Sequence, residues 1–358
     1  MKIITILGTR PEIIRLSEII KKLDLYMEHI LVHTGQNFDY EMNDVFFKEL
    51  AVRKPDYFIN SRANSPFKQI SIILEKTEEI LLKEKPDSVL ILGDTNSGLS
   101  AIVAKRLGIP VFHMEAGNRC YSDKVPEEIN RRIIDSCSDI LLPYTQRSRE
   151  QLLVEGYSPR KIFVIGNPIV EVVRKHKKKA KNRGILKKLG IKKGEKYSLV
   201  TMHREENVDD PKILSGLYKA LLDISKNCKV IVSTHPRTKK KIRKIAINTD
   251  ENLKFMDPFG FIDFLKLESN ACCIITDSGT VQEEAAILSR PCILIRSSTE
   301  RPELIECGGV IMAGIDRDEI VDSFNMALKL SNNINLPKDY NDNVSDKIVK
   351  ILRKYKNV

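Results

Sequence analysis

Several common signals are missing from this chain. It has no apolar run near the roughly 18 residues of a membrane helix, so we expect a cytoplasmic protein without membrane association. Its seven cysteines include no C-x-x-C pair, and its six histidines lack the spacing of metal ligands. The sequence therefore predicts reduced core cysteines and no metal site.

Two nucleotide-binding motifs are also absent. No G-x-G-x-x-G follows an apolar run, and no G-x-x-x-x-G-K-[S/T] occurs anywhere in the chain. These absences argue against nicotinamide chemistry and against ATP hydrolysis at a P-loop.

Positive charge is in excess, with 59 Lys and Arg against 48 Asp and Glu and a formal net charge of +11. Much of it lies in the stretches 174–196 and 237–244, which have no interleaved aromatic residues and no nucleic-acid motif. We interpret both stretches as solvated linker and helix faces and expect no nucleic-acid partner. A nucleic-acid-binding protein is the alternative from a different functional class.

Short apolar runs alternate with amphipathic helical stretches along the whole chain. Because such runs are nearly continuous in apolar residues, they predict parallel strands covered on both faces by helices. The predicted strands are 2–7, 30–33, 88–92, 110–114, 140–142 and 162–165 in the first half, and 197–202, 229–234, 253–256, 272–276, 292–295 and 310–312 in the second.

The strand and helix rhythm restarts after the basic stretch that begins near Arg174. We therefore predict an α/β protein with two doubly wound parallel-sheet domains that face a cleft. The predicted domains are 1–167 and 168–345, joined near Gly166-Asn167-Pro168, and a terminal helix at 346–358 is predicted to return to the first domain.

Polar residues follow many of the predicted strands. In an open parallel sheet, ligands bind just past the carboxyl ends of the strands, so these segments predict a site to which both halves contribute. The segments are Gly8-Thr9-Arg10, Gly93-Asp94-Thr95, Glu115-Ala116-Gly117, His203-Arg204, His235-Pro236-Arg237 and Asp277-Ser278-Gly279.

The segment Ser278-Gly279-Thr280 connects a predicted strand to a predicted helix. Free backbone N–H groups at such a helix start can hold a phosphate, and a carboxylate farther along the helix, Glu283 or Glu284, could accept the hydroxyls of an attached ribose. The alternative is an ordinary N-cap formed by Asp277 or Ser278.

Carboxylates and arginines are concentrated in the first half. Asp94, Glu115 and the pair Glu127 and Glu128 are candidates for general acid and base roles. The alternative is that each glutamate pairs with a nearby arginine on the surface. His203, directly after a strand, is placed for phosphate oxygens or has a structural role.

Several motifs together resemble the non-hydrolysing UDP-N-acetylglucosamine 2-epimerases. They follow the order of that family and span almost the whole chain. The motifs are GTRPE at 8–12, GDT at 93–95, HMEAGNR at 113–119, PEEINR at 126–131, MHREEN at 202–207, TDSGTVQEE at 276–284 and TERPE at 299–303.

The resemblance implies two Rossmann-like domains in the glycosyltransferase-B arrangement and the conversion of UDP-GlcNAc to UDP-ManNAc. It assigns proton transfer to Asp94, Glu115 and Glu127, and also implies a homodimer, with a second UDP-GlcNAc as a possible activator near Gln36 and Arg62. By matching position, the residues that hold the substrate are Arg10, Arg15, His203, Phe264, Ser278, Gly279, Thr280, Glu284 and Arg301.

The expected reaction expels UDP from carbon 1 while a base removes the proton on carbon 2, and UDP then adds back to the resulting glycal. Arg10, His203 and the helix start at Gly279 stabilise the departing anion in this scheme. No cofactor is expected. A hydrolysing epimerase and a glycosyltransferase of the same fold are the alternatives.

Overall fold

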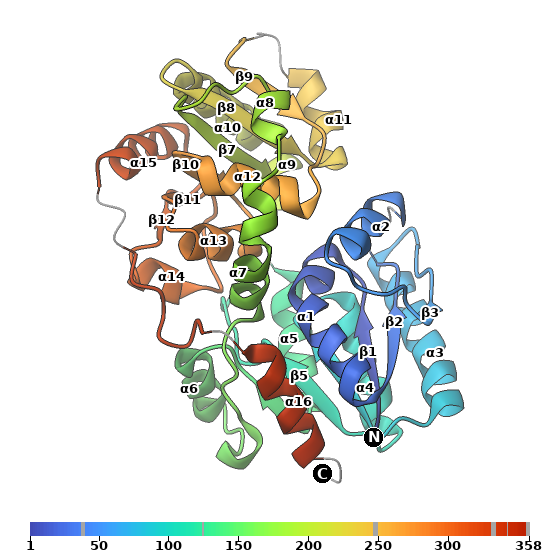
Figure 1. Cartoon of the computed structure of the whole chain (residues 1–358). Helices are drawn as coiled ribbons and strands as arrows, with labels where there is room; N and C mark the ends of the chain where they lie inside the picture. Colours follow the sequence, from blue (N-terminus) through green and yellow to red (C-terminus); the bar gives the residue numbers. More distant parts are fainter. Residues whose placement is uncertain (37–39, 124, 246–249, 331–333, 342, 356–358) are drawn as a thin grey trace. The chain divides into compact units, whose positions relative to one another are not determined.

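The structure is a computed structural model that describes residues 1–36, 40–123, 125–245, 250–330, 334–341 and 343–355, without the side chains of 40–44, 236, 237 and 244 (Figure 1). The predictions for the side chains of Pro236 and Arg237 and for residues 356–358 lie outside the described residues. The chain forms two compact units, Met1–Val172 with Lys338–Val358, and Val173–Pro337.

The first unit contains, in its described residues, a six-stranded sheet in the order β3-β2-β1-β4-β5-β6. All neighbouring strands are parallel, and β1 lies between β2 and β4. The strands are β1 (Lys2–Leu7), β2 (Glu28–His33), β3 (Tyr57–Phe58), β4 (Ser88–Leu92), β5 (Val111–Met114) and β6 (Ile140–Leu142).

Helices connect these strands and cover the sheet (Figure 1). They are α1 (Arg10–Tyr26), α2 (Tyr40–Glu49), α3 (Pro66–Glu84), α4 (Ser100–Arg106), α5 (Pro126–Cys137), α6 (Gln146–Val154) and, from the end of the chain, α16 (Val344–Lys354), with short 3-10 turns at Asn96–Leu99 and Pro159–Lys161. The helix α7 (Pro168–Lys181) carries the chain into the second unit.

The second unit repeats this plan with a six-stranded parallel sheet, among its described residues, in the order β12-β11-β10-β7-β8-β9. Its strands are β7 (Tyr197–Met202), β8 (Lys229–Thr234), β9 (Leu253–Met256), β10 (Cys273–Thr276), β11 (Cys292–Leu294) and β12 (Val310–Met312). Its helices are α8 (Ile185–Lys188), α9 (Glu205–Val208), α10 (Pro211–Ser225), α11 (Pro236–Ile245), α12 (Phe261–Asn270), α13 (Gly279–Ile287), α14 (Pro302–Glu306) and α15 (Arg317–Lys329).

Both units have the strand order of a Rossmann-like, doubly wound fold, so the predicted fold class is confirmed. The order of the strands along the chain reverses between β1 and β4 in the first unit and between β7 and β10 in the second. Ligands of such sheets bind at this reversal, beyond the carboxyl ends of the strands.

The sequence predicted most strands within one or two residues, because most are apolar runs that are largely buried. The strand predicted at 162–165 is wrong. This segment runs beside β6, where Phe163 N donates to Leu141 O (2.9 Å) and Ile165 N to Pro143 O (3.0 Å), but only one isolated bridge forms. Pro143 has no N–H group to continue the ladder.

The first helix forms as its sequence pattern predicts. Pro11 lies in the first turn of α1, and the apolar side chains at spacings of three and four are fully buried. These side chains are Ile13, Leu16, Ile20 and Leu23, each 0% exposed.

Helix α16 packs against α1 within the first unit. Asp346 accepts a bond from Lys22 (2.6 Å), and Ser345 binds Glu171 through both its backbone N–H (3.1 Å) and its hydroxyl (2.8 Å). Val344 and Ile348 are fully buried. Helix α16 is therefore part of the core of the first unit.

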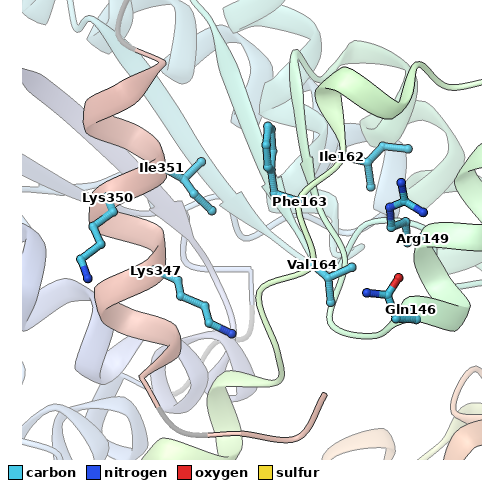
Figure 2. A pocket seen from close by; sticks show the side chains of 8 residues that line it. All are labelled: Gln146, Arg149, Ile162, Phe163, Val164, Lys347, Lys350 and Ile351. Atoms are coloured by element: carbon cyan, nitrogen blue, oxygen red, sulfur yellow. The ribbon is translucent and has the colours of Figure 1, made fainter. Parts of the chain in front are cut away.

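Each unit also contains a groove away from the predicted site residues. In the first unit, a groove of about 460 Å³ has Lys347 and Lys350 of α16 on one side and Arg149 on the other, with Phe163 and Ile351 between them (Figure 2). In the second, α7 and α12 line a groove of about 560 Å³. Its basic side chains on α7 belong to the stretch predicted to be solvated, and Lys266 lies on α12. None of the helices in the described residues has the length and apolarity required to span a membrane.

Candidate active site

The loop after β1 is held by a buried carboxylate. Glu12 accepts bonds from the backbone N–H groups of Gly8 (3.1 Å) and Thr9 (2.7 Å), from Thr9 Oγ1 (2.6 Å) and from Thr95 Oγ1 (3.2 Å). Burial raises the pKa of Glu12 to about 7, and these hydrogen bonds oppose that shift. The network joins the loops after β1 and β4 and fixes the start of α1, where Arg10 lies 5.4 Å from the ring centre of Phe46.

Replacing Gly8 with alanine tests how tightly this loop packs. The added Cβ would lie 2.1 Å from Ser97 Oγ and 2.1 Å from Thr34 Oγ1, two buried hydroxyls that bind each other. Because these short side chains cannot swing away, we expect the free energy of unfolding to fall by about 1–3 kcal/mol. Urea denaturation measures the change.

Gly216→Ala is the matched control, because Gly216 lies within α10 and nothing stands within 4 Å of its added Cβ. That change should raise the free energy of unfolding by roughly 0.5–1 kcal/mol through helix propensity. Equal stability of the two variants would contradict the described packing.

The carboxylate of Glu115 follows β5 and faces the first helix. Its Oε2 accepts a bond from Arg15 Nη1 (2.6 Å) and its Oε1 from Asn118 Nδ2 (3.2 Å). Glu115 has a φ of 68°, a left-handed conformation that costs on the order of 1–3 kcal/mol for a residue with a side chain. Such strain is concentrated at functional sites, which supports the candidate role of Glu115.

Asp94 follows β4, the strand next to β5. Its carboxylate binds the guanidinium of Arg131, with a distance of 3.1 Å to Nε, and its backbone carbonyl accepts from Asn130 Nδ2 (2.9 Å). Both partners belong to α5, and exposed Glu127 lies in the first turn of the same helix. The structure thus places Asp94 and Glu115 at neighbouring strand ends of one sheet.

Glu128 has a different environment from Glu127. It is fully buried, and it binds Arg131 (2.5 Å), Arg132 (3.0 Å) and the backbone N–H groups of Cys120 (3.0 Å) and Tyr121 (3.2 Å). Burial raises its pKa, but the Cys120 N–H and Arg131 outweigh that effect and lower it overall. The alternative to a catalytic role, pairing with arginine, therefore holds for Glu128, but the pair with Arg131 is buried and not at the surface, and it gives Glu128 a structural role.

A buried network beneath these loops was not predicted from the sequence. His113 Nδ1 lies 2.7 Å from Asp135, its Nε2 lies 2.9 Å from the carbonyl of Gly93, and Asp135 pairs with Arg119 at 2.8 Å. Asp135 also accepts from Gly117 N (3.2 Å). These contacts fix the loops that carry Asp94 and Glu115. One indication of this network was visible in the sequence, since His113 and Arg119 belong to the same motif. Their common partner Asp135 lies outside that motif.

In the second unit, Asp277 joins the loops after β7 and β10. Its Oδ2 accepts from the backbone N–H groups of His203 (2.9 Å) and Arg204 (3.0 Å) and from Asn207 Nδ2 (3.1 Å). The ring of His203 is 40% exposed, and its Nδ1 lies 3.2 Å from Asp277 Oδ1. This contact holds the ring beside Asp277.

Helix α13 begins at this same strand reversal. Ser278 is its N-cap and accepts from Val281 N (3.4 Å), so the predicted cap is confirmed. Gly279 and Thr280 are half-buried in the first turn. A Cβ at Gly279 would lie 2.7 Å from Glu300 Oε1, so a carboxylate already lies over this helix start. The positive end of the helix dipole favours an anion at this position.

The glutamates of α13 have separate environments. Glu283 binds Arg301 Nε at 2.6 Å, and both side chains are buried. The adjacent Glu284 is 3% exposed, and its carboxyl group contacts that of Glu268 on α12. Phe264, the predicted uracil contact, is half-buried on α12 as well.

The remaining candidates lie in the first unit. Gln36 Oε1 accepts from Ser97 N and Ser97 Oγ, both at 3.0 Å, whereas Arg62 is exposed. Their assignment to an activator site stays a prediction, as do the ligand contacts of all the site residues above.

Comparisons with known proteins agree with the motifs. Residues 21–353 match the family described as UDP-N-acetylglucosamine 2-epimerase. A protein of that name from Methanococcus maripaludis is 43% identical, with 97% of each chain covered. The crystal structure of the Methanocaldococcus jannaschii UDP-GlcNAc 2-epimerase in complex with UDP-GlcNAc and UDP has a TM-score of 0.93 at 38% identity and covers 99% of this chain and 100% of its own.

The UDP-2,3-diacetamido-2,3-dideoxy-D-glucuronate 2-epimerase of Pseudomonas aeruginosa is also similar, at 36% identity over 92% of each chain. Similarity of this degree therefore extends to enzymes named for different UDP-sugars.

Proposed function

Because the chain belongs to the UDP-N-acetylglucosamine 2-epimerase family, we propose that it interconverts UDP-GlcNAc and UDP-ManNAc by inverting carbon 2. The observation that carries this proposal is the match, over almost the full length, to an epimerase crystallised with UDP-GlcNAc and UDP. The strand-end carboxylates of the first unit and the helix start of the second supply the chemistry that the reaction needs.

The hydrogen on carbon 2 is not next to a carbonyl group, so its direct removal at neutral pH is prohibitively slow. In the proposed reaction, a base removes this proton while the bond between carbon 1 and the diphosphate breaks, and its electrons leave with UDP. The product is a glycal. Protonation of carbon 2 from the other face and return of UDP to carbon 1 give the epimer, so no hydride carrier takes part.

The first unit supplies the proton transfers in this scheme. Glu115 and Asp94 lie at neighbouring strand ends, each beside a guanidinium, and Glu127 is exposed in the first turn of α5. We assign Glu115, Asp94 and Glu127 together to the acid and base steps. A group that acts as the base in one direction of the reaction acts as the acid in the other direction. Arg10, at the start of α1, binds the diphosphate.

The second unit holds UDP. The N–H groups of Gly279 and Thr280, with Ser278 as the cap, receive a phosphate at the start of α13, and His203 stabilises the charge that develops as UDP leaves. Glu284 accepts the ribose hydroxyls, Phe264 contacts the uracil, and Arg301 supports this region through its ion pair with Glu283. Arg15 holds the Glu115 carboxylate in the first unit.

Product analysis tests the proposal. The purified protein is incubated with UDP-GlcNAc alone, and its products are separated by anion-exchange chromatography. We expect UDP-ManNAc in equilibrium with UDP-GlcNAc. Free ManNAc with UDP would instead identify a hydrolysing epimerase, and sugar transfer only in the presence of an acceptor would identify a glycosyltransferase.

A second candidate substrate follows from the relative named for a diacetamido glucuronate. The same assay with UDP-2,3-diacetamido-2,3-dideoxy-D-glucuronate compares the two sugars directly through kcat/KM. A higher value for UDP-GlcNAc is expected, and a higher value for the uronate would move the assignment to that substrate.

A further inference from the structure

A buried carboxyl group of the second unit has no part in the scheme above. Glu268 lies in the last turn of α12 and is 0% exposed. Neither of its carboxyl oxygens receives a hydrogen bond from a donor group among the described residues. A charged carboxylate in this position would lose its hydration without compensation, and the negative end of the α12 dipole would oppose it as well.

The group that Glu268 contacts is the carboxyl of Glu284, on the neighbouring helix α13. Two ionised carboxylates cannot hydrogen-bond to each other, because both only accept. With one proton between them, the pair gains a hydrogen bond and loses one of its two negative charges. Burial first, and then the charge of Glu284, raise the pKa of Glu268 well above its usual range.

The surroundings indicate which partner holds the proton. Glu284 is slightly exposed, whereas Glu268 is fully buried at the negative end of the α12 dipole, so Glu284 is the better site for the charge. The other titratable groups that interact with Glu268 are Tyr197 of β7 and Cys292 of β11. Burial raises the pKa of both, so both are neutral at pH 7, and the nearby cation Arg290 acts on Tyr197.

We propose that Glu268 is a positioning residue that stays protonated and donates its O–H to Glu284, aiming the Glu284 carboxylate at the ribose of UDP. This inference rests on the proposed function, because it takes the role of Glu284 in binding UDP as given. Glu268 itself touches no ligand in this arrangement. It fixes the rotamer of Glu284 and keeps a second negative charge away from an anionic ligand.

Two substitutions separate donation from packing. Glu268→Gln keeps the shape and supplies an amide N–H in place of the O–H, whereas Glu268→Met fills the space without a donor. Calorimetric titration with UDP at pH 7 should give Glu268→Gln an affinity within about threefold of the unsubstituted protein and Glu268→Met a loss of about tenfold. Equal losses in the two variants would overturn the proposal.

The dependence of the affinity for UDP on pH distinguishes a protonated Glu268 from a residue that only fills space. As pH rises far enough to ionise Glu268, the affinity of the unsubstituted protein for UDP should fall, whereas Glu268→Gln should show no such fall. Glu195→Gln is the matched control, since Glu195 forms a surface pair with Lys229 (2.7 Å) in the same unit and should keep the original profile. The same alkaline fall in Glu268→Gln would contradict the proposal.

An infrared measurement detects the proton of Glu268 directly. At pH 7 the neutral carboxylic acid absorption, to which Glu12 also contributes, should be weaker in Glu268→Gln than in the unsubstituted protein and unchanged in Glu195→Gln. Equal absorption in Glu268→Gln and in an unsubstituted protein that binds UDP overturns this inference alone. Failure of the unsubstituted protein to bind UDP contradicts the proposed function, and the inference with it.

Discussion

Glu115→Gln is expected to lower kcat/KM for the epimerisation of UDP-GlcNAc by at least about 100-fold. Glutamine has the shape of glutamate but can neither take up nor donate the proton of carbon 2. The Glu115 carboxylate that it replaces is held by Arg15 at 2.6 Å. The backbone of Glu115, at the end of a strand, has a left-handed conformation. Steady-state kinetics with product chromatography measure the change.

Two controls separate proton transfer from damage to the fold. Glu84→Gln removes the ion pair with Lys2 (2.7 Å) in the same unit but away from the strand ends that carry the site, and should leave kcat/KM within about twofold. The affinity of Glu115→Gln for UDP should also be retained. A near-normal rate for Glu115→Gln would remove Glu115 from the chemical step.

His203→Ala is the second change with a large expected effect, a loss of about 100-fold in kcat/KM. The contact of His203 Nδ1 with Asp277 (3.2 Å) orients the ring, and the ring is 40% exposed, so a ligand can reach it. Alanine removes the group that stabilises charge on the departing diphosphate. Because this charge develops mainly as the bond breaks, kcat should fall more than the affinity for UDP-GlcNAc.

Lys241→Ala provides the comparison for that variant. It removes another cationic side chain of the second unit, one that pairs with Asp209 (2.5 Å) on the surface, and should leave kcat unchanged. If His203→Ala weakened the affinity for UDP-GlcNAc and left kcat unchanged, His203 would act in ground-state binding rather than in bond cleavage.

Much of the fold was predictable because it depends on local patterns. Buried parallel strands are apolar throughout, and the stripe of α1 has the helical period, so both are visible in the sequence. The two-residue strand β3 is too short to give such a pattern. The segment 162–165 does not continue the ladder beside β6, because Pro143 has no N–H group. The apolar run at 162–165 does not reveal this.

The strand-end rule likewise predicted that Asp94, Glu115, His203 and Ser278 follow strands, because it depends only on where strands stop, and their roles in a site stay predictions. It could not show how these residues are held. The contact of Glu268 with Glu284 joins two different helices, and that of Asp135 with His113 joins a helix to a strand end. Such pairings arise from packing between elements distant in sequence.

The central claim is that carbon 2 exchanges its proton with solvent while UDP leaves and returns. Incubation of the protein with UDP-GlcNAc in heavy water, without added NAD, tests it most directly. Mass spectrometry and proton NMR should show deuterium at carbon 2 of both UDP-GlcNAc and UDP-ManNAc as they equilibrate. Formation of UDP-ManNAc with no deuterium at carbon 2 would contradict the account.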